Sequence, residues 1–150
     1  MRTRMYEKRM KKLETADKEI PVSERVSFFG DLDASVTVVS WGSPKGAVLE
    51  AIRRLDQEGY KLNFLQVRMP HPLPKEYVAD VLGKAKRKIA VEGNYSAQLA
   101  GIIKENTGID MDYFVLKWNG RPMSSDEVYG ALKMIMQDKA PKRQVLLGGT

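Results

Sequence analysis

The stretch that decides the fold class is residues 35–46, which read SVTVVSWGSPKG. Its first seven residues are rich in β-branched side chains, which is typical of a strand buried on both faces. Gly42 ends that strand, Ser43 is placed to cap a following helix, and Pro44 suits the first position of that helix. Apolar residues then recur at helical spacing, at Val48, Ala51, Ile52 and Leu55. The stretch therefore predicts one strand followed by one helix.

The same alternation continues toward the C-terminus. Strands are predicted at residues 62–67, 88–91 and 113–118. Helices are predicted from Pro74, over Tyr95 to Ile103, and from the capping box of Ser124 and Glu127. This alternation with short loops favours a three-layer α/β fold, in which a mostly parallel sheet carries helices on both faces. We expect sites at the C-terminal ends of the strands, at residues 41–46, 67–74, 92–96 and 118–123.

The two ends of the chain differ from this alternating middle. Residues 1–34 are predicted to form a basic helix and a linker, with Pro21 after the helix and a short extended piece at 26–29. Residues 35–141 are predicted to form the α/β domain. Residues 142–150 are a tail, for which a short extra strand and disorder are both open.

The positive charge is concentrated at the N-terminus. Residues 1–12 carry six bases and one acid, a net charge of +5, whereas the other 138 residues carry 19 bases against 18 acids. A charge confined to one arm favours a solvated helix, or one that docks on a partner protein, over a nucleic-acid-binding face. We therefore expect no nucleic acid among the partners.

The composition excludes several kinds of site. The chain has no cysteine, which excludes disulfides, cysteine nucleophiles and cysteine-held iron–sulfur clusters. With a single histidine, no metal site is expected. No apolar run reaches the roughly 20 residues of a membrane span, and the N-terminus lacks the apolar core of a secretion signal. We expect a cytoplasmic protein without membrane contact.

Two loops are candidates for contact with an anion. Gly42, Ser43, Lys45 and Gly46 follow a strand and open a helix, whose N-terminus favours anions. Their spacing matches neither the dinucleotide fingerprint nor the P-loop, so a tight structural turn is the alternative. His71 lies in a loop with three prolines, and imidazole exchanges protons near neutral pH. No acid is spaced to orient His71, so a shaped surface loop is the alternative there.

Polar residues after two strands are candidates for an interface. Glu92, Asn94 and Gln98 cluster where a strand gives way to a helix, either as a docking surface or as a well-capped turn. Arg121 follows an Asn-Gly turn and is placed to pair with an acid on a neighbouring molecule. Neither a nucleophile triad nor a carboxylate pair is recognisable, so we expect no catalytic residue in this chain.

Four motifs in order resemble one enzyme family. They are VVSWGSPKG at 38–46, FLQVRMPHPLP at 64–74, VEGNYSAQL at 91–99 and KWNGRP at 117–122. With them, the chain resembles the C-terminal part of the alpha subunit of 2-oxoacid:ferredoxin oxidoreductases. Residues 2–21 resemble the linker helix that precedes this part in the family.

The resemblance implies that other domains of the enzyme hold the cofactors. The family is related to transketolase, and the resembling region is its transketolase C-terminal-like domain, called domain II. Family members convert a 2-oxoacid and coenzyme A to acyl-CoA and reduce ferredoxin. Thiamine diphosphate, Mg²⁺ and an iron–sulfur cluster are expected in the complete enzyme, and none of them is expected on this chain alone. The expected partners are the rest of the alpha subunit, the beta subunit and, through the complex, ferredoxin.

Two departures from the family limit what the resemblance implies. The chain begins at the linker, without the upstream domain that carries the catalytic glutamate. We therefore expect a piece of the alpha subunit with a structural and assembly role and no turnover alone. Ala97 also stands where the family motif has glycine.

Other functions stay open at this point. One is a free-standing nucleotide- or anion-binding module, and another is a dimerisation domain that forms a homodimer. Coenzyme A contact through Ser43, Lys45 or His71 is a further possibility.

Overall fold

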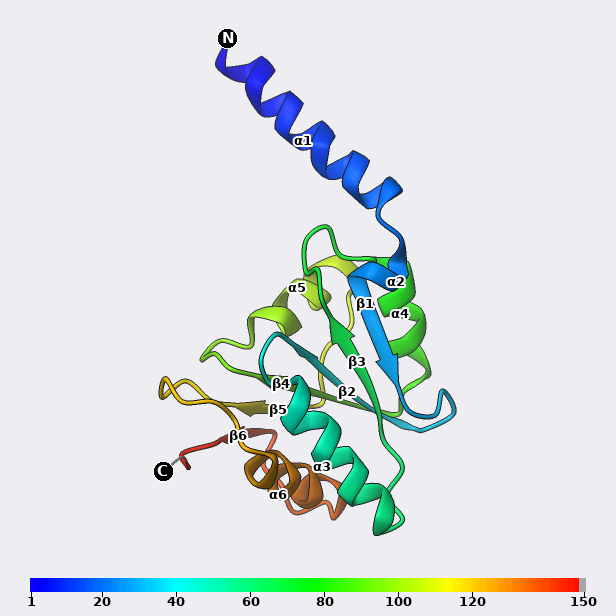
Figure 1. Cartoon of the computed structure of the whole chain (residues 1–150), viewed down its shortest axis with the longest axis vertical. Helices are drawn as coiled ribbons and strands as arrows, with labels where there is room; N and C mark the ends of the chain where they lie inside the picture. The colour runs from blue at the N-terminus through cyan, green and yellow to red at the C-terminus, as the bar shows by residue number, and fades with distance from the viewer. Residues whose placement is uncertain (149–150) are drawn as a thin grey trace.

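A computed structural model of the chain describes residues 1–148, and its centre is a six-stranded sheet with helices on both faces (Figure 1). The helices are α1 (Arg2–Glu19), α2 (Val22–Arg25), α3 (Lys45–Gln57), α4 (Lys75–Lys84), α5 (Gln98–Thr107) and α6 (Ser125–Met136). The strands are β1 (Val26–Phe29), β2 (Val36–Trp41), β3 (Asn63–Val67), β4 (Arg87–Glu92), β5 (Tyr113–Leu116) and β6 (Arg143–Val145).

The strand order is β1-β3-β2-β4-β5-β6, and every neighbouring pair is parallel except β1 with β3. The central strand β2 places Val39 between Leu65 of β3 and Ala90 of β4. The predicted three-layer, mostly parallel fold is confirmed. The four predicted strands are joined at one edge by β1, which coincides with the short extended piece predicted at 26–29, and at the other edge by β6. β6 agrees with the short extra strand that is one of the two alternatives for the tail, of which residues 149 and 150 lie outside the described residues.

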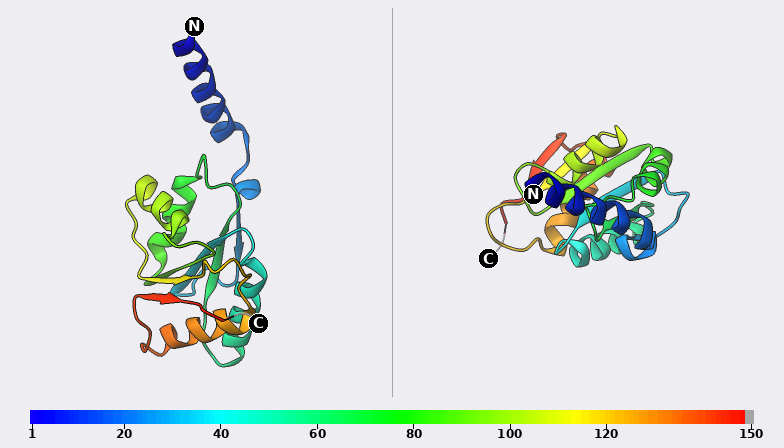
Figure 2. Two further views of the ribbon diagram at one scale, coloured as in Figure 1. Left: turned by 90° about the vertical axis from the view of Figure 1, so that its left-hand side faces the viewer. Right: turned by 90° about the horizontal axis from the view of Figure 1, so that it is seen from above.

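Alternate residues of the strands build two cores, one on each face of the sheet. One face packs against α3 and α6, and the other against α4 and α5 (Figures 1 and 2). Val38 of β2 belongs to the first core, and its neighbour Val39 belongs to the second. Because both faces are covered, the strands contain nearly continuous apolar residues instead of alternating polar ones.

Three local predictions are corrected at the ends of helices. Ser43 does not cap α3, because Pro44 occupies the cap position and no side chain bonds there. The helix predicted to include Tyr95 begins only at Gln98, because the preceding residues form a turn that brings Ala97 into the left-handed region. α6 ends at Met136, before Pro141 could stop it. The capping box of α6 is confirmed by bonds in both directions between Ser124 and Glu127.

α1 projects away from the body of the domain (Figures 1 and 2). None of its residues is buried. In the part of the chain that the structure describes, neither α1 nor any other helix is long and apolar enough to cross a bilayer.

Candidate functional site

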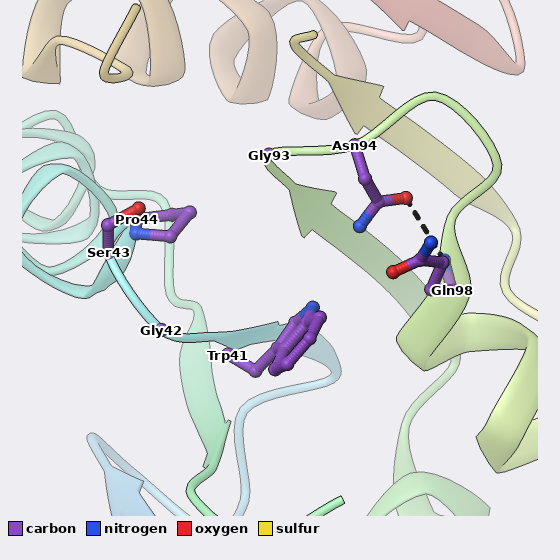
Figure 3. Close-up of a pocket in the computed structure, with 7 residues that line it drawn as sticks. All are labelled: Trp41, Gly42, Ser43, Pro44, Gly93, Asn94 and Gln98. Carbon is purple, nitrogen blue, oxygen red and sulfur yellow. Dashed lines mark hydrogen bonds between the residues drawn. The ribbon is translucent and has the colours of Figure 1, made fainter. Parts of the chain in front are cut away.

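The candidate site is a crevice between the C-terminal ends of β2 and β4. The helix that follows β2 covers one face of the sheet, and the helix that follows β4 covers the other. The two loops therefore diverge, and such a switch point is where open α/β sheets place their sites. The cavity has a volume of about 360 Å³ and is lined by Trp41, Gly42, Ser43, Pro44, Gly93, Asn94 and Gln98 (Figure 3).

A second hollow of about 430 Å³ adjoins the first and shares Ser43, Pro44 and Gly93 with it. Its other side is formed by the loop after β5, with Lys117, Trp118, Gly120, Arg121, Pro122 and Met123. The two hollows together are called the switch-point crevice below. The crevice thus spans the C-terminal ends of three adjacent strands, β2, β4 and β5.

Glu92 is buried behind the lining of this crevice, and its carboxylate accepts four hydrogen bonds, two of them from the lining residues Trp41 and Asn94. Oε2 accepts from Trp41 Nε1 at 3.3 Å, Asn94 Nδ2 at 2.9 Å and the Leu99 N–H at 2.9 Å. Oε1 accepts from the Ala100 N–H at 3.0 Å. The carboxylate thereby takes two of the free N–H groups at the start of α5, where the helix dipole favours a negative charge. The anion site at this helix end is filled by the protein itself.

Burial sets Glu92 apart from the other three predicted interface residues. It is only 1% exposed, and both its carboxylate oxygens accept hydrogen bonds from within the domain. Asn94 and Gln98 do reach the surface of the crevice, where Asn94 Oδ1 accepts from the Gln98 N–H at 3.1 Å (Figure 3). Arg121 is exposed in the adjoining hollow. The structure therefore brings Asn94, Gln98 and Arg121 to one surface, and Glu92 supports that surface from below.

The predicted anion-contact residues are not brought together. Gly42, whose φ is +68°, and Ser43 line the crevice. Lys45 lines neither hollow, because its ammonium lies over the Phe29 ring, 5.2 Å from the ring centroid. His71 is exposed on the loop after β3, also outside both hollows. The crevice therefore lacks the two groups that would have carried positive charge toward an anion.

Beside the crevice lies an aromatic cluster that the sequence did not reveal. Tyr95 and Trp118 meet edge to face, with ring centroids 4.7 Å apart. The Arg143 guanidinium lies over both rings, at 5.2 Å and 5.9 Å from their centroids, and donates to the Tyr95 carbonyl. Tyr95 is 65% exposed and Trp118 41% exposed. Large exposed rings held beside an arginine are typical of interface anchors.

A buried ion pair fixes the loop that carries Trp118 and Arg121. The Lys117 ammonium donates to both oxygens of Glu127, at 2.9 Å and 2.7 Å, and to the Pro122 carbonyl at 2.9 Å. Burial opposes the charged form of Glu127, but the bond from Lys117 and the bonds with Ser124 outweigh it, so the pKa of Glu127 lies below its ordinary value. The pair joins the end of β5 to the start of α6.

Residues 1–148 contain no group of three or more His, Asp or Glu side chains placed to hold a metal ion. The polar groups of the crevice are amides, a hydroxyl and backbone N–H groups, with Arg121 as its exposed charge. This set can hold and orient a neighbouring chain or ligand through hydrogen bonds. None of the described residues that line the crevice is a His, Asp or Glu.

Comparison with known proteins places these features in a family. Residues 34–128 match the family described as pyruvate:ferredoxin oxidoreductase core domain II. The chain belongs to this family. The alpha subunit of the 2-oxoacid:ferredoxin oxidoreductase from Saccharolobus solfataricus is 48% identical over 148 residues, which are 99% of this chain and 23% of that subunit. An alpha subunit from Aeropyrum pernix is 47% identical over 134 residues, which are 87% of this chain and 21% of that subunit. The domain II chain thus spans about a quarter of the length of these relatives.

Solved structures agree with this assignment. The alpha chain of a probable 2-oxoacid ferredoxin oxidoreductase from Thermoplasma acidophilum is 43% identical, with a TM-score of 0.54 over 76% of this chain and 98% of that one. A 2-oxoglutarate:ferredoxin oxidoreductase from Magnetococcus marinus is 25% identical, with a TM-score of 0.72 over 88% of this chain and 23% of that one. A split-gene transketolase, 18% identical with a TM-score of 0.57 over 78% of this chain and 43% of that one, shares the fold. The family resemblance and the transketolase-like fold of domain II are both confirmed.

Proposed function

We propose that this domain II chain is an assembly domain of a 2-oxoacid:ferredoxin oxidoreductase. It docks on the rest of the alpha subunit and on the beta subunit through the switch-point crevice and the aromatic cluster, and it has no turnover alone. The observation that carries the proposal is the match of almost the whole chain, at 48% identity, to an alpha subunit about four times as long. The exposed rings of Tyr95 and Trp118 at the crevice support docking at this side of the sheet.

The cofactors of the reaction belong to the partners in this proposal. The chain has no cysteine to hold an iron–sulfur cluster, and residues 1–148 offer no carboxylate cluster for Mg²⁺. We therefore assign thiamine diphosphate, Mg²⁺ and the cluster to the other domains, and ferredoxin to a contact within the complete cytoplasmic enzyme. A free-standing nucleotide-binding module is not favoured, because Glu92 already fills the anion site of α5. Contact between coenzyme A and Ser43, Lys45 or His71 stays a prediction.

Reconstitution tests the proposal. The chain is mixed with an alpha subunit that lacks this region and with the beta subunit, both from the same source and both shown to be folded. Dye reduction that depends on a 2-oxoacid is then measured. We expect activity only when all three components are present. Absence of both binding and activity would contradict the proposal.

A matched pair of variants locates the docking surface in the same assay. Trp118→Ala removes an exposed ring beside the crevice, whereas Met134→Ala removes an equally exposed apolar side chain on α6, 42% against 41% exposed. A central aromatic anchor contributes about 2 kcal/mol or more, so we expect Trp118→Ala to weaken assembly by about thirtyfold. Met134→Ala should change it by less than about twofold. Equal effects of the two variants would place the docking surface elsewhere.

A further inference from the structure

The N-terminal helix α1 has an apolar stripe that stays fully or partly exposed within residues 1–148. Tyr6, Met10 and Leu13 lie on one side of the helix by their spacing, and none of the 18 residues of α1 is buried. The helix projects from the body in both views (Figures 1 and 2). An isolated helix of this length is marginal in water, so contact with another surface would stabilise it.

The direction of α1 is fixed by a buried arginine. Arg25 donates from Nη1 to Asp17 Oδ1 at 2.5 Å and from Nη2 to the Asp17 carbonyl at 3.2 Å. The same guanidinium reaches the Pro72 carbonyl at 3.5 Å. These bonds join the last turn of α1 to the end of α2, directly before β1, and to the loop after β3. α1 therefore leaves the body at a defined place and angle.

That place lies at the C-terminal ends of the parallel strands, which is the side of the sheet that carries the switch-point crevice. β1 runs antiparallel to β3, so its first residue, Val26, pairs with the last residue of β3, Val67. The chain thus enters the sheet where the parallel strands end. In Figure 1 the base of α1 stands beside the loop after β3. A partner that approaches the C-terminal ends of the strands therefore meets both α1 and the crevice.

The charge of α1 specifies what it can bind. Residues 1–12 carry six bases and one acid, and none of these bases forms an ion pair within residues 1–148. Arg2 and Arg9 lie in the apolar stripe itself, since each precedes a stripe residue by four positions, whereas Lys12 follows Lys8 by four positions and lies on the other side of the helix. A surface that covers the stripe therefore meets guanidinium groups, which carboxylates satisfy in a bidentate manner.

We infer that α1 binds an acidic, partly apolar surface on the remaining alpha and beta subunits, next to the surface bound by the crevice. This inference rests on the proposed function. A protein partner is favoured over a polyanion for two reasons. Apolar residues share the binding side of the helix with the bases, and the match to the Saccharolobus solfataricus alpha subunit covers 99% of this chain, α1 included.

Three charge-reversal variants of the full chain test the inference. The first is Arg2→Glu/Arg9→Glu, on the side of the stripe. The second is Arg4→Glu/Lys11→Glu, which places the same charge change on the opposite side of the same helix. The third is Lys86→Glu/Lys142→Glu, at exposed positions near the N-terminal ends of β4 and β6. Binding to the alpha-subunit remainder with the beta subunit is followed by surface plasmon resonance.

The expected order of effects follows from geometry. At about 0.1 M salt, where charges act over about 10 Å, the stripe-side variant should lower affinity by at least about tenfold. The opposite-side variant should mainly slow association, and the third should change affinity by less than about twofold. Raising the salt to about 1 M should bring the wild type close to the stripe-side variant. Far-UV circular dichroism checks that the fold of each variant is intact.

Several results would overturn the inference. Equal affinity of the wild type and the stripe-side variant, with the wild type still bound to the enzyme, would exclude α1 from the interface and leave the proposed function standing. A wild-type chain that binds none of the subunits would overturn both. Tighter binding of the wild type to single-stranded DNA or to phosphatidylserine vesicles than to the subunits would replace the protein surface with a polyanion.

Discussion

Replacing Glu92 with glutamine removes the negative charge on which the crevice is built. The oxygen of the glutamine amide can serve the three donors on Oε2, Trp41 Nε1, Asn94 Nδ2 and the Leu99 N–H, or the single donor on Oε1, the Ala100 N–H. The amide nitrogen, which is itself a donor, then faces the N–H groups that the other carboxylate oxygen accepts from in the wild type. At least one buried donor is left without an acceptor, and the remaining bonds lose their charge.

The cost of this change follows from the number of bonds. Three bonds that change from charged to neutral lose about 1 kcal/mol each, and one unpaired buried N–H costs about 1–3 kcal/mol. We expect Glu92→Gln to lower the free energy of unfolding by about 4–6 kcal/mol. A domain of this size has about 5–15 kcal/mol of stability, so the variant should still fold in the cold.

Urea unfolding followed by tryptophan fluorescence measures this effect. A Trp118→Phe background leaves Trp41 as the reporter, so the same signal shows whether its indole loses the bond to Glu92. Glu105→Gln, at an exposed position of α5, is the matched control and should change stability by less than about 0.5 kcal/mol. If Glu92→Gln and Glu105→Gln were equally stable, the account of the crevice as a structure organised by Glu92 would be refuted.

Two further predictions concern the loops around the crevice. Ala97 has a φ of 54°, so Ala97→Gly should stabilise the domain by about 0.5–1 kcal/mol. Ala100→Gly, inside α5, should destabilise the domain by about 1 kcal/mol. Thermal unfolding of both variants checks that the two effects have opposite signs. Glu127→Gln leaves the buried Lys117 ammonium without a counter-charge and should cost about 3–5 kcal/mol at neutral pH. The pKa of Glu127 is lower in the folded state than its ordinary value. The ionised carboxylate therefore contributes its full stabilisation at a pH above the ordinary pKa, and this contribution is lost as the pH falls through the folded-state pKa. The difference from wild type should therefore shrink below about pH 4 in urea titrations, and a constant difference would contradict the assignment.

Local patterns in the sequence were sufficient to predict the alternating core of this domain. The strand at residues 35–41 and the capping box of Ser124 and Glu127 were predicted correctly because neighbouring residues determine them. The extended piece predicted at 26–29 is β1, but its antiparallel pairing with β3 could not be predicted from local sequence. For β6, a strand and disorder both stayed open, because a strand of three residues carries little periodic signal and is defined by its pairing partner.

The site depends on contacts between segments that are distant in sequence. The stretch around Glu92 is unusual in sequence, but its hydrogen-bond donors cannot be predicted from local spacing, because one of them, Trp41, lies 51 residues away. The other donors become available only because α5 begins at Gln98. The aromatic cluster joins Tyr95, Trp118 and Arg143 from three separate segments, and no local spacing relates them. One local feature of the sequence did point to unusual backbone geometry at the site. Ala97 stands at a position where the family motif has glycine, and it adopts a left-handed backbone conformation.

Hydrogen exchange of the chain, alone and with the remaining alpha and beta subunits, tests the central claim most directly. The claim is that the domain docks through the edge that carries the switch-point crevice and α1. The account predicts that the subunits slow exchange in α1, at residues 93–98 and at residues 118–123. It predicts no change at the opposite edge, around residues 84–88, 108–112 and 138–142. Protection confined to that opposite edge, or no protection at all from subunits that are folded, would contradict the account.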